Sequence, residues 1–509
     1  MYVTIILIIP LLIFLYIHMK KSRQELKHLP SPFCLPIIGH LHLMRKNSKE
    51  PWKAFDELAK KFGEIYKLQL GQCSYVVIAG VEAAKEALIK NGNSCLNRPL
   101  MTTYDLVVKG QQYSIHFADW SDMHQDIRKH LIIHTLSGNS TKSGQLQSIS
   151  EKGISKLIKS EKRKYSNLHV DQLLSIFGEI MLDYICGTNY LDSESKQSSY
   201  PITNIFMEGH DKLKDAHILD VFPVLRYFKF FFPSIGKLSK SHDDIIDLLE
   251  KEAGLGNLRE KLRINSSNNQ IFNEYLNFSE IIIKKHLENP SNLPWRNCIF
   301  MIGGLLLNLV PISYLTMVCL GYLSLNKKFQ EQIYQEVRGI MAGGGDEIVP
   351  MKEARKLVHV EASLMESVRL TSPFYLPRRT NQDITVKGYH IPANTGLIIN
   401  NYTLDHSPLR WKSPECFMPE RFIVTGDEDG LAATRIKKPS DHYPYGLGRR
   451  ACPGYGLFEN LASLMIANIV YRYEVSCDMG EEEMSKHGLG NYGLFDGRNF
   501  FSLKLNRRL

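Results

Sequence analysis

The segment around Cys452 carries the residue types in this sequence that are most able to do chemistry. It reads Tyr445-Gly-Leu-Gly-Arg-Arg-Ala-Cys452-Pro-Gly454, so one cysteine lies in a glycine-rich bend directly before an apolar helical pattern over residues 457–471. Amide donors at a helix start and nearby arginines lower the pKa of a thiol, and we therefore expect Cys452 to be a thiolate that binds a metal. The alternative is a small core residue, the usual role of a lone cysteine.

Two further motifs precede this segment. Glu366 and Arg369 are three residues apart on a predicted helix, and Arg421 follows in Phe417-Met-Pro-Glu-Arg421-Phe. Residues at this helical spacing are neighbours, and a second arginine arriving from a loop can share the carboxylate in a forked network. The hypothesis is that this structural network braces the loop that carries Cys452.

These motifs together resemble the cytochrome P450 superfamily, microsomal type. The Cys452 segment matches the haem-binding signature Phe-x-x-Gly-x-Arg-x-Cys-x-Gly, except that Tyr445 stands where phenylalanine is usual. Glu366 and Arg369 match the family's Glu-x-x-Arg motif, and Arg421 matches its Pro-Glu-Arg-Phe segment. The resemblance extends over nearly the whole chain and implies the family's helical haem-thiolate fold.

The resemblance implies a monooxygenase that uses haem b, dioxygen and electrons from NADPH passed on by NADPH-cytochrome P450 reductase. Cys452 would be the iron ligand, and its sulfur would favour O–O cleavage. Tyr445 and Gly454 belong to the same cofactor-binding signature. Arg450 and Arg378 would be cationic partners of the haem propionates.

Trp120 fits the family's tryptophan on an early helix and is also expected at the cofactor. The arginine that normally follows four residues later is His124 here, and Arg128 and Lys129 come one turn further on. Arg128 is a predicted cofactor-binding residue, although which of these three side chains touches a propionate stays open.

The central helix departs from the family pattern. Alignment of Gly303-Gly304 leaves Leu306 and Leu307 where an acid and an alcohol usually pass protons to oxygen. Pro311 has no amide hydrogen, so the carbonyl of Leu307 loses its helical partner and the helix kinks there. One hypothesis is that this carbonyl, with Asn308, holds a water that relays protons; the other is that Pro311 only bends the helix for packing.

The missing acid–alcohol pair and the segment Asp119-Trp-Ser-Asp122 resemble the insect Spook-type group, which acts early in ecdysteroid synthesis. This resemblance implies a sterol substrate such as 7-dehydrocholesterol, and the apolar face of Ile302, Leu305, Leu306 and Leu309 is compatible with a sterol or any other lipophile. The alternatives are a haem-thiolate isomerase or dehydratase, a monooxygenase of other lipophilic compounds, and a haem protein that carries or senses a lipid without turnover.

The N-terminus predicts a membrane anchor. Residues 2–18 contain no acid, lysine or arginine, whereas Lys20, Lys21, Arg23 and Lys27 follow directly. By length and by the positive-inside rule, we predict a transmembrane anchor at 1–19, a basic and proline-rich hinge at 20–40, and a haem domain at 41–509. The expected location is the endoplasmic reticulum membrane, with the catalytic domain on the cytoplasmic side. A cleaved signal peptide is the alternative, although its charge would precede the apolar core.

Composition limits the partners. The 509 residues carry 62 lysines and arginines against 53 acids, a net charge of +9 that is spread along the chain. This modest excess suits an acidic protein or an anionic membrane, and we expect no nucleic-acid partner. The nine cysteines are scattered without a Cys-x-x-Cys pair, which indicates reduced thiols in a cytosol-facing domain.

The periodicity predicts a mainly helical fold with small β-sheets and no linker or repeat that would divide it. Apolar spacing near 3.6 predicts helices at 52–62, 81–91, 124–136, 168–186, 243–251 and 278–286, and short β-branched runs predict strands at 67–70, 74–79, 383–386 and 396–400. The uncharged run Ile299–Tyr322 could span a membrane, but we interpret it as the buried central helix of the domain.

Overall fold

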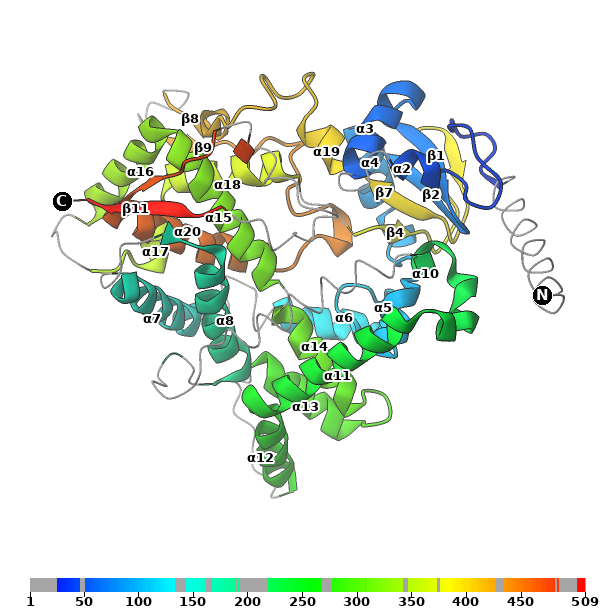
Figure 1. Cartoon of the computed structure of the whole chain (residues 1–509), viewed down its shortest axis with the longest axis horizontal. Coiled ribbons are helices and arrows are strands. Elements are labelled where there is room, and N and C mark those ends of the chain that lie inside the picture. Colours follow the sequence, from blue (N-terminus) through cyan, green and yellow to red (C-terminus); the bar gives the residue numbers. More distant parts are fainter. Residues whose placement is uncertain are drawn as a thin grey trace.

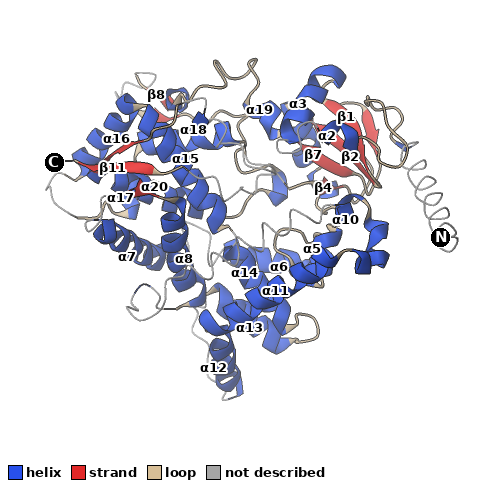
Figure 2. Ribbon diagram, viewed as in Figure 1, coloured by secondary structure: helices blue, strands red, loops and turns tan. Residues whose placement is uncertain are grey.

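The computed structural model describes residues 25–45, 51–132, 143–161, 167–188, 191, 218–267, 277–306, 308–341, 347–372, 376–426, 434–480, 483–484 and 501–508. The predicted anchor at 1–19 and the residue Leu307 lie outside these ranges. A helical body fills most of the molecule, and the largest sheet lies at the opposite end from the C-terminus (Figures 1 and 2). The predicted fold class, mainly α with small sheets, is confirmed.

Helices α2–α10 span Leu41–Arg45, Pro51–Phe62, Val81–Lys85, Thr102–Val108, Asp122–Leu131, Ser143–Glu161, Val170–Cys186 and, for α10, Ile218–Val221. Helices α11–α20 span Pro233–Glu252, Leu255–Ser267, Phe278–Glu288, Trp295–Leu306, Leu309–Leu325, Lys327–Ile340, Met351–Ala354, Val358–Thr371, Asn401–Asp405 and Tyr455–Arg472. Each helix predicted from periodicity is present within the described residues. Most ends agree within a few residues, but α11 begins ten residues before the predicted start at 243, and the predicted helix 81–91 continues after α4 as the π-helical turn Glu86–Lys90. The helices α7, α12 and α16 were not predicted.

Strands β1–β11 span Ile65–Leu70, Cys73–Ile78, Asn167–Leu168, Arg378–Arg379, Ile384–Val386, Tyr389–Ile391, Gly396–Ile399, Ile423–Val424, Arg435–Ile436, Tyr473–Ser476 and Leu503–Arg507. Four of them form a sheet in the order β1-β2-β7-β4, in which β7 runs parallel to β2 and the other pairs are antiparallel. The strands β10, β11 and β3 form a second sheet, and β5-β6 and β8-β9 are hairpins. The sequence predicted only the strands with clear β-branched runs.

The uncharged central segment is buried, as predicted. It forms α14 and α15, and α15 packs against α8, α18 and α20 in the main hydrophobic core. Within the described ranges, Trp295–Leu325 is the one stretch long and apolar enough to cross a membrane, and 76% of its apolar window is buried inside the protein. This helical segment, which is apolar on all sides, is therefore a buried core element of the domain.

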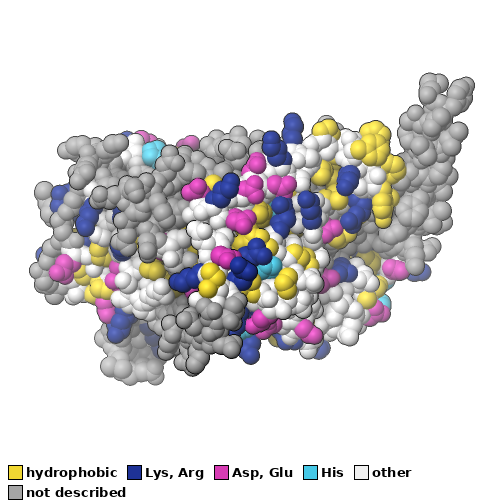
Figure 3. All heavy atoms as spheres, turned by 90° about the horizontal axis from the view of Figure 1, so that it is seen from below, with side chains coloured by type: hydrophobic (Ala, Val, Ile, Leu, Met, Phe, Trp, Pro, Cys, Tyr) yellow, Lys and Arg dark blue, Asp and Glu magenta, His cyan; other side chains and the backbone are white. Residues whose placement is uncertain are grey.

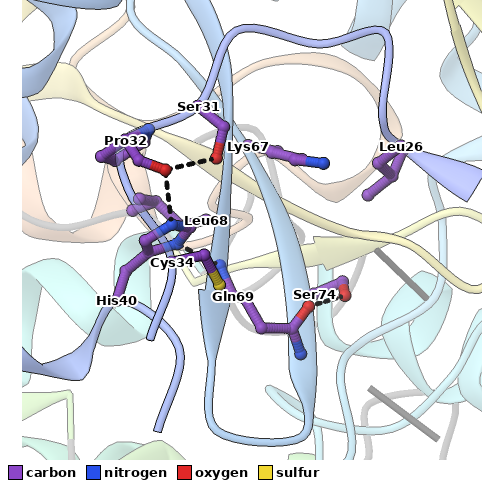
Figure 4. Close-up of a pocket in the computed structure, with 9 residues that line it drawn as sticks. All are labelled: Leu26, Ser31, Pro32, Cys34, His40, Lys67, Leu68, Gln69 and Ser74. Atoms are coloured by element: carbon purple, nitrogen blue, oxygen red, sulfur yellow. Dashed lines mark hydrogen bonds between the residues drawn. The ribbon is translucent and has the colours of Figure 1, made fainter. Parts of the chain in front are cut away.

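The described part of the proline-rich hinge is attached to the edge of the large sheet. The Lys67 N–H donates to the Pro30 carbonyl at 2.9 Å, and the ring of His40 lies between Pro32 and Gln69 (Figure 4). His40 Nδ1 accepts the Gln69 N–H at 2.8 Å, which leaves Nε2–H to donate to the Pro32 carbonyl at 3.1 Å. Both ring nitrogens of a fully buried histidine thus hold the hinge at a fixed place on β1.

A cavity of about 230 Å³ lies between the hinge and β1 (Figure 4). Its polar groups bond to their surroundings: Ser31 Oγ donates to the Pro32 carbonyl, and the Gln69 side chain bonds to Ser74 Oγ and to the Gly71 carbonyl. This arrangement marks the cavity as part of the hinge attachment, remote from the cysteine segment singled out by the sequence.

Candidate active site

The loop before α20 holds Cys452 through backbone bonds and two glycines in left-handed conformations. The Cys452 N–H donates to the Tyr445 carbonyl at 2.8 Å and closes the loop. Gly446 has φ of +86° and Gly448 has φ of +68°, values that glycine adopts without strain. At Gly448, a Cβ would also lie 2.1 Å from the Leu88 carbonyl oxygen, so a side chain has no room where this loop meets the helical turn Glu86–Lys90.

The Cys452 thiol has the amide donors that the sequence predicted, but its pKa moves the other way. The residue is exposed on one side, and the backbone N–H groups of Gly454 and Tyr455 act to lower the pKa of its thiol. Desolvation by the surrounding protein raises the pKa, and this effect exceeds the lowering by the two amides and by Arg128. The predicted net lowering is wrong for the metal-free chain. A bound metal would displace the proton directly, so the loop can still present a thiolate to iron.

Four arginines from distant parts of the chain lie close enough to repel one another. They are Arg98, Arg128, Arg378 and Arg450; Arg98, Arg378 and Arg450 are each less than 8% exposed. Burial, followed by repulsion from neighbouring arginines, lowers the pKa of Arg378 to about 9 and that of Arg450 to about 10. Within the described part of the chain, none of the four forms an ion pair with a carboxylate.

The hydrogen bonds of this cluster go to backbone carbonyls. Arg98 donates to the carbonyls of His116, Leu376 and Pro377. Arg450 donates to those of Leu96 and Ala118, and Arg128 to that of Ala451 beside the cysteine. Arg378 Nη1 is buried without a hydrogen-bond partner.

This cluster fits a haem. Buried cations are stable when a counter-charge pairs with them, and two propionates would supply that charge beside a cysteine ligand. Arg378 and Arg450 were predicted from the resemblance. Arg98 was missed, because a single arginine in an irregular loop carries no periodic or motif signal.

Trp120 lies among these cations. The guanidinium carbons of Arg449 and Arg450 stand 5.2 and 5.1 Å from the centre of its ring, within the range of cation–π attraction. The His124 ring is 5.5 Å away, and burial followed by repulsion from the arginines lowers its pKa to about 3. Arg128 reaches the cysteine loop, whereas Lys129 is exposed on the other face of α6. Of the three side chains left open by the sequence, Arg128 and His124 are therefore the ones placed beside the cluster.

Glu366, Arg369 and Arg421 form the fork that their spacing predicts. Arg369 Nε and Nη2 donate to the two oxygens of Glu366, each at 2.8 Å, and both side chains are fully buried. Arg421 Nε and the Met418 N–H add bonds to Glu366 Oε1 at 3.1 and 2.9 Å. Arg369 and Arg421 also donate to carbonyls between residues 405 and 416, so the fork orders that stretch directly.

The fork reaches the cysteine segment through an intermediate side chain. The guanidinium groups of Arg369 and Arg421 stand over the Trp411 ring, and that ring packs edge-on against His442 at 5.4 Å. Arg410 adds a bond from its Nη2 to the Asp441 carbonyl. The predicted brace therefore acts on the start of the segment that leads to Cys452, several residues before the cysteine itself.

The central helix breaks between α14 and α15, where Pro311 predicts a loss of helical bonding. Asn308 lies in the break, and its Nδ2 donates to the carbonyls of Gly304 at 3.2 Å and Leu305 at 3.3 Å. The Asn308 side chain also lies beside His116, from the loop before α6, where it acts to raise the pKa of that imidazole. Since Leu307 lies outside the described residues, its carbonyl is not placed. Sequence reasoning missed His116, which is 192 residues before Asn308 in the sequence.

The fold and the site together define a haem-thiolate class of protein: one cysteine on a glycine-rich loop, a buried cationic cluster beside it and a helical body behind it. The model of the cytochrome P450 family matches residues 29–494, and the chain belongs to this family. It is accordingly a monooxygenase that uses haem iron and electrons from a reductase partner.

Plant enzymes are among its relatives. The chain is 27% identical to amorpha-4,11-diene 12-monooxygenase of Artemisia annua over 92% of this chain and 90% of that enzyme. It is 27% identical to psoralen synthase of Ammi majus, with the same coverage, and 26% identical to the sarpagan bridge enzyme of Gelsemium sempervirens, over 94% and 93%. These names cover different substrates, so the comparisons give the family and leave the substrate open.

Substitution of the buried carboxylate tests the fork. Glu366→Gln leaves Arg369 buried beside a neutral amide, and we expect the free energy of unfolding of the haem protein to fall by about 3–5 kcal/mol. The matched control is Glu260→Gln, which removes the carboxylate of an exposed pair with Arg263 at the same spacing and should cost less than about 1 kcal/mol. Urea unfolding followed by circular dichroism measures both; equal effects of the two substitutions would contradict the structural role of the fork.

Proposed function

We propose that this enzyme oxidises a lipophilic substrate, with Cys452 as the axial ligand of the haem iron and Arg98, Arg128, Arg378 and Arg450 as partners of the propionates. The observation that carries this proposal is the placement of four arginines, without carboxylate partners, around the loop of an exposed cysteine. When bound, the haem supplies the activation of dioxygen. The protein contributes the sulfur ligand, the counter-charges and an apolar surrounding.

Apolar side chains beside the helix break favour a lipophilic substrate. Tyr104 of α5 packs against Phe117 at 4.6 Å and against Phe300 of α14 at 5.7 Å, and Phe117 directly follows His116. The predicted apolar face of α14 and α15, which consists of Ile302, Leu305, Leu306 and Leu309, is buried. Apolar walls of this kind bind apolar ligands through the surface area that becomes buried, and a small number of polar groups set the orientation of the ligand.

A sterol remains the particular substrate that we propose, on the Spook-type resemblance of the central helix and of the segment 119–122. That resemblance places the reaction early in ecdysteroid synthesis. The second candidate is an isomerase or dehydratase, favoured by one observation: Leu306 and Leu307 occupy the places of the acid and the alcohol. Independence from NADPH distinguishes this second activity from oxygenation.

For proton delivery, we propose the pair formed by His116 and Asn308. Burial is the main cause that lowers the pKa of His116 to about 4, so the imidazole is neutral at pH 7. A neutral imidazole has one nitrogen that donates and one that accepts, and can therefore take up and release a proton at different atoms. Asn308 holds this ring at the point where the central helix is open. The pair would replace the relay first assigned to the Leu307 carbonyl and Asn308.

For the membrane, we propose that the N-terminal anchor at 1–19 holds the enzyme on the endoplasmic reticulum and that an aromatic segment touches the same bilayer. The 3₁₀ segment Pro223–Phe231 leaves Tyr227 76%, Phe230 71% and Phe231 70% exposed. Hydrophobic side chains gather at one end of the face shown in Figure 3. Exposed aromatic residues of this kind are typical of membrane contact.

Hydrogen bonds link this aromatic segment to the hinge. The Gln72 N–H donates to the Val221 carbonyl at 2.7 Å, and Gln72 Oε1 accepts the Val224 N–H at 3.0 Å. The neighbouring Gly71 N–H donates to Ile38 of the hinge at 3.4 Å. The anchor and the aromatic segment would therefore meet the bilayer from the same end of the domain.

Product analysis tests the proposed function. The purified enzyme is incubated with reductase, NADPH, dioxygen and 7-dehydrocholesterol, and we expect an oxygenated or rearranged sterol that forms only when NADPH is present. Mass spectrometry identifies the product. A product formed without NADPH would favour the isomerase, and no product from protein with intact thiolate ligation would overturn the sterol assignment.

Substitution at the helix break tests the proton pair. Asn308→Ala removes the contact with His116, and we expect product per NADPH consumed to fall several-fold while reduced oxygen species increase. The control is Asn326→Ala, which removes a helix cap at α16 and costs about 1 kcal/mol without touching the break. An unchanged yield in Asn308→Ala would contradict the pair. A large rise in yield with Leu307→Thr would show that the native chain has no efficient relay.

Vesicle binding tests the aromatic segment. In a chain that lacks residues 1–19, Phe230→Ser with Phe231→Ser should weaken binding to anionic phospholipid vesicles by at least tenfold, because each side chain contributes about 1.5–3 kcal/mol of apolar burial. Leu409→Ser is the control, since Leu409 is 96% exposed and lies outside the segment. Sedimentation with vesicles gives the affinities; equal loss in both proteins would contradict a specific aromatic contact.

A further inference from the structure

Asp119 holds the main chain of Arg98 together with a second side chain. Its Oδ1 accepts the Arg98 N–H at 2.9 Å, and its Oδ2 pairs with Arg379 Nη2 at 2.6 Å. Arg379 Nε in turn donates to the Arg98 carbonyl at 2.9 Å. The N–H and the carbonyl of one residue are thus bonded to an acidic and a basic side chain that also pair with each other. We call this closed set of three contacts the Arg98 clamp.

The Arg98 clamp joins three segments that are far apart in the sequence. Asn97 forms an isolated bridge with Arg379 of β4, whose N–H donates to the Asn97 carbonyl at 2.7 Å. The side-chain oxygen of Asn97 accepts the Trp120 N–H at 3.3 Å. Residues 97–98 are therefore fixed both to β4 and to the loop before α6. Each of the three segments carries one member of the cationic site, namely Arg98, Arg378 and Trp120.

Repulsion between the buried arginines works against their arrangement. Burial, followed by the charges of Arg378 and Arg450, lowers the pKa of Arg98. The Arg98 side chain itself donates to three backbone carbonyls, which carry no net charge. A carboxylate that holds the main chain restrains the position of this residue without pairing with its guanidinium group. The guanidinium group therefore keeps its charge for an anionic ligand.

The clamp reaches from the surface to the buried site. The side chain of Asp119 is 47% exposed and that of Arg379 is 28% exposed, whereas Arg98 is only 7% exposed. An isolated ion pair at this exposure contributes little to the stability of a protein. Here both partners also bond to one buried residue, so the pair acts mainly on the placement of Arg98.

We propose that Asp119 is a positioning residue for the proposed haem site, in which it and Arg379 hold Arg98 where a propionate is received. This inference rests on the proposed pairing of Arg98 with a propionate. Asp119 belongs to the segment Asp119-Trp-Ser-Asp122, which the sequence singled out for its resemblance to a sub-family. The clamp gives this segment a structural role that is independent of the substrate.

The experiment measures hydrogen bonding to the propionates in the full-length holoenzyme. The propionate-bending band in the resonance Raman spectrum reports these bonds, and transfer of haem to excess apomyoglobin gives the rate of haem loss. In Asp119→Ala we expect the band to shift and haem loss to accelerate about fivefold, the change expected for one hydrogen bond. The matched control is Asp122→Ala, which removes an exposed carboxylate from the same segment and should leave the band and the rate unchanged.

Two further variants separate the hydrogen bond from the charge. Burial lowers the pKa of Arg450, and the Asp119 charge acts against this lowering, so loss of charge alone could affect the site. Asp119→Asn keeps an oxygen that can accept the Arg98 N–H, and it should retain most of the native rate. Asp119→Arg combined with Arg379→Asp keeps an ion pair but offers this N–H no acceptor, and it should behave like Asp119→Ala. Native behaviour of the exchanged pair, or equal effects of Asp119→Asn and Asp119→Ala, would overturn the clamp.

Arg98→Ala distinguishes failure of this inference from failure of the proposed function. If Arg98→Ala shifts the propionate band and Asp119→Ala does not, the clamp is wrong and the pairing with the propionate stands. An unchanged band in Arg98→Ala would overturn the pairing itself, and the inference with it. A lower urea midpoint of unfolding in Asp119→Ala with an unchanged band would show a role in stability alone, which would also overturn the positioning role.

Discussion

Buried positive charge without an ion-paired carboxylate among the described residues is the constraint on which this structure depends. Arg98, Arg378 and Arg450 are taken out of water beside Arg128. Backbone carbonyls accept hydrogen bonds from Arg98 and Arg450, whereas Arg378 Nη1 has no hydrogen-bond partner among the described residues. Carbonyl dipoles reduce the cost of burial but leave the net charge in place. A haem held by Cys452, as proposed, would offset part of this charge through its two propionates and would bring the iron to the sulfur. The charge cluster and the cysteine are therefore parts of one site, although their residues are spread from position 98 to 452.

The remaining scaffold holds this site by joining segments that are distant in sequence. Glu366 is fully buried with Arg369 and accepts a hydrogen bond from Arg421, so that α18 is tied to the stretch around residues 405–421. The Trp411 ring in turn contacts the His442 ring, and the Tyr445 ring packs against Phe458 of α20. Each step is a short-range contact of a rigid ring or a forked ion pair. If Cys452 binds the haem as proposed, this chain of contacts gives residues that lie away from the cysteine a part in positioning its loop.

The sequence predicted the parts of this site that depend on local pattern. The helix periodicities, the buried central segment and the spacing of Glu366 and Arg369 are set by neighbouring residues. Arg98 and His116 escaped prediction because their positions beside the site arise only when loops and helices meet in three dimensions. The pKa of Cys452 was predicted in the wrong direction, because the amides and Arg128 are visible in the sequence while the degree of desolvation is not. Short strands such as β3 and β11 were missed since pairing with a distant partner, more than local propensity, makes them strands.

At the break in the central helix, we propose that His116, from the loop before α6, takes the place of the missing acid and alcohol. With leucine at positions 306 and 307, these two places of the central helix offer no side chain that can pass on a proton. Pro311 has no N–H and therefore removes one helical hydrogen bond. The Asn308 side chain donates to the carbonyls of Gly304 and Leu305 just before this point. Because these bonds occupy the amide hydrogens of Asn308, its oxygen is the atom left for His116. If His116 and Asn308 pass protons as proposed, the chemistry of this site depends on how the loop before α6 packs against the central helix as much as on the helix itself.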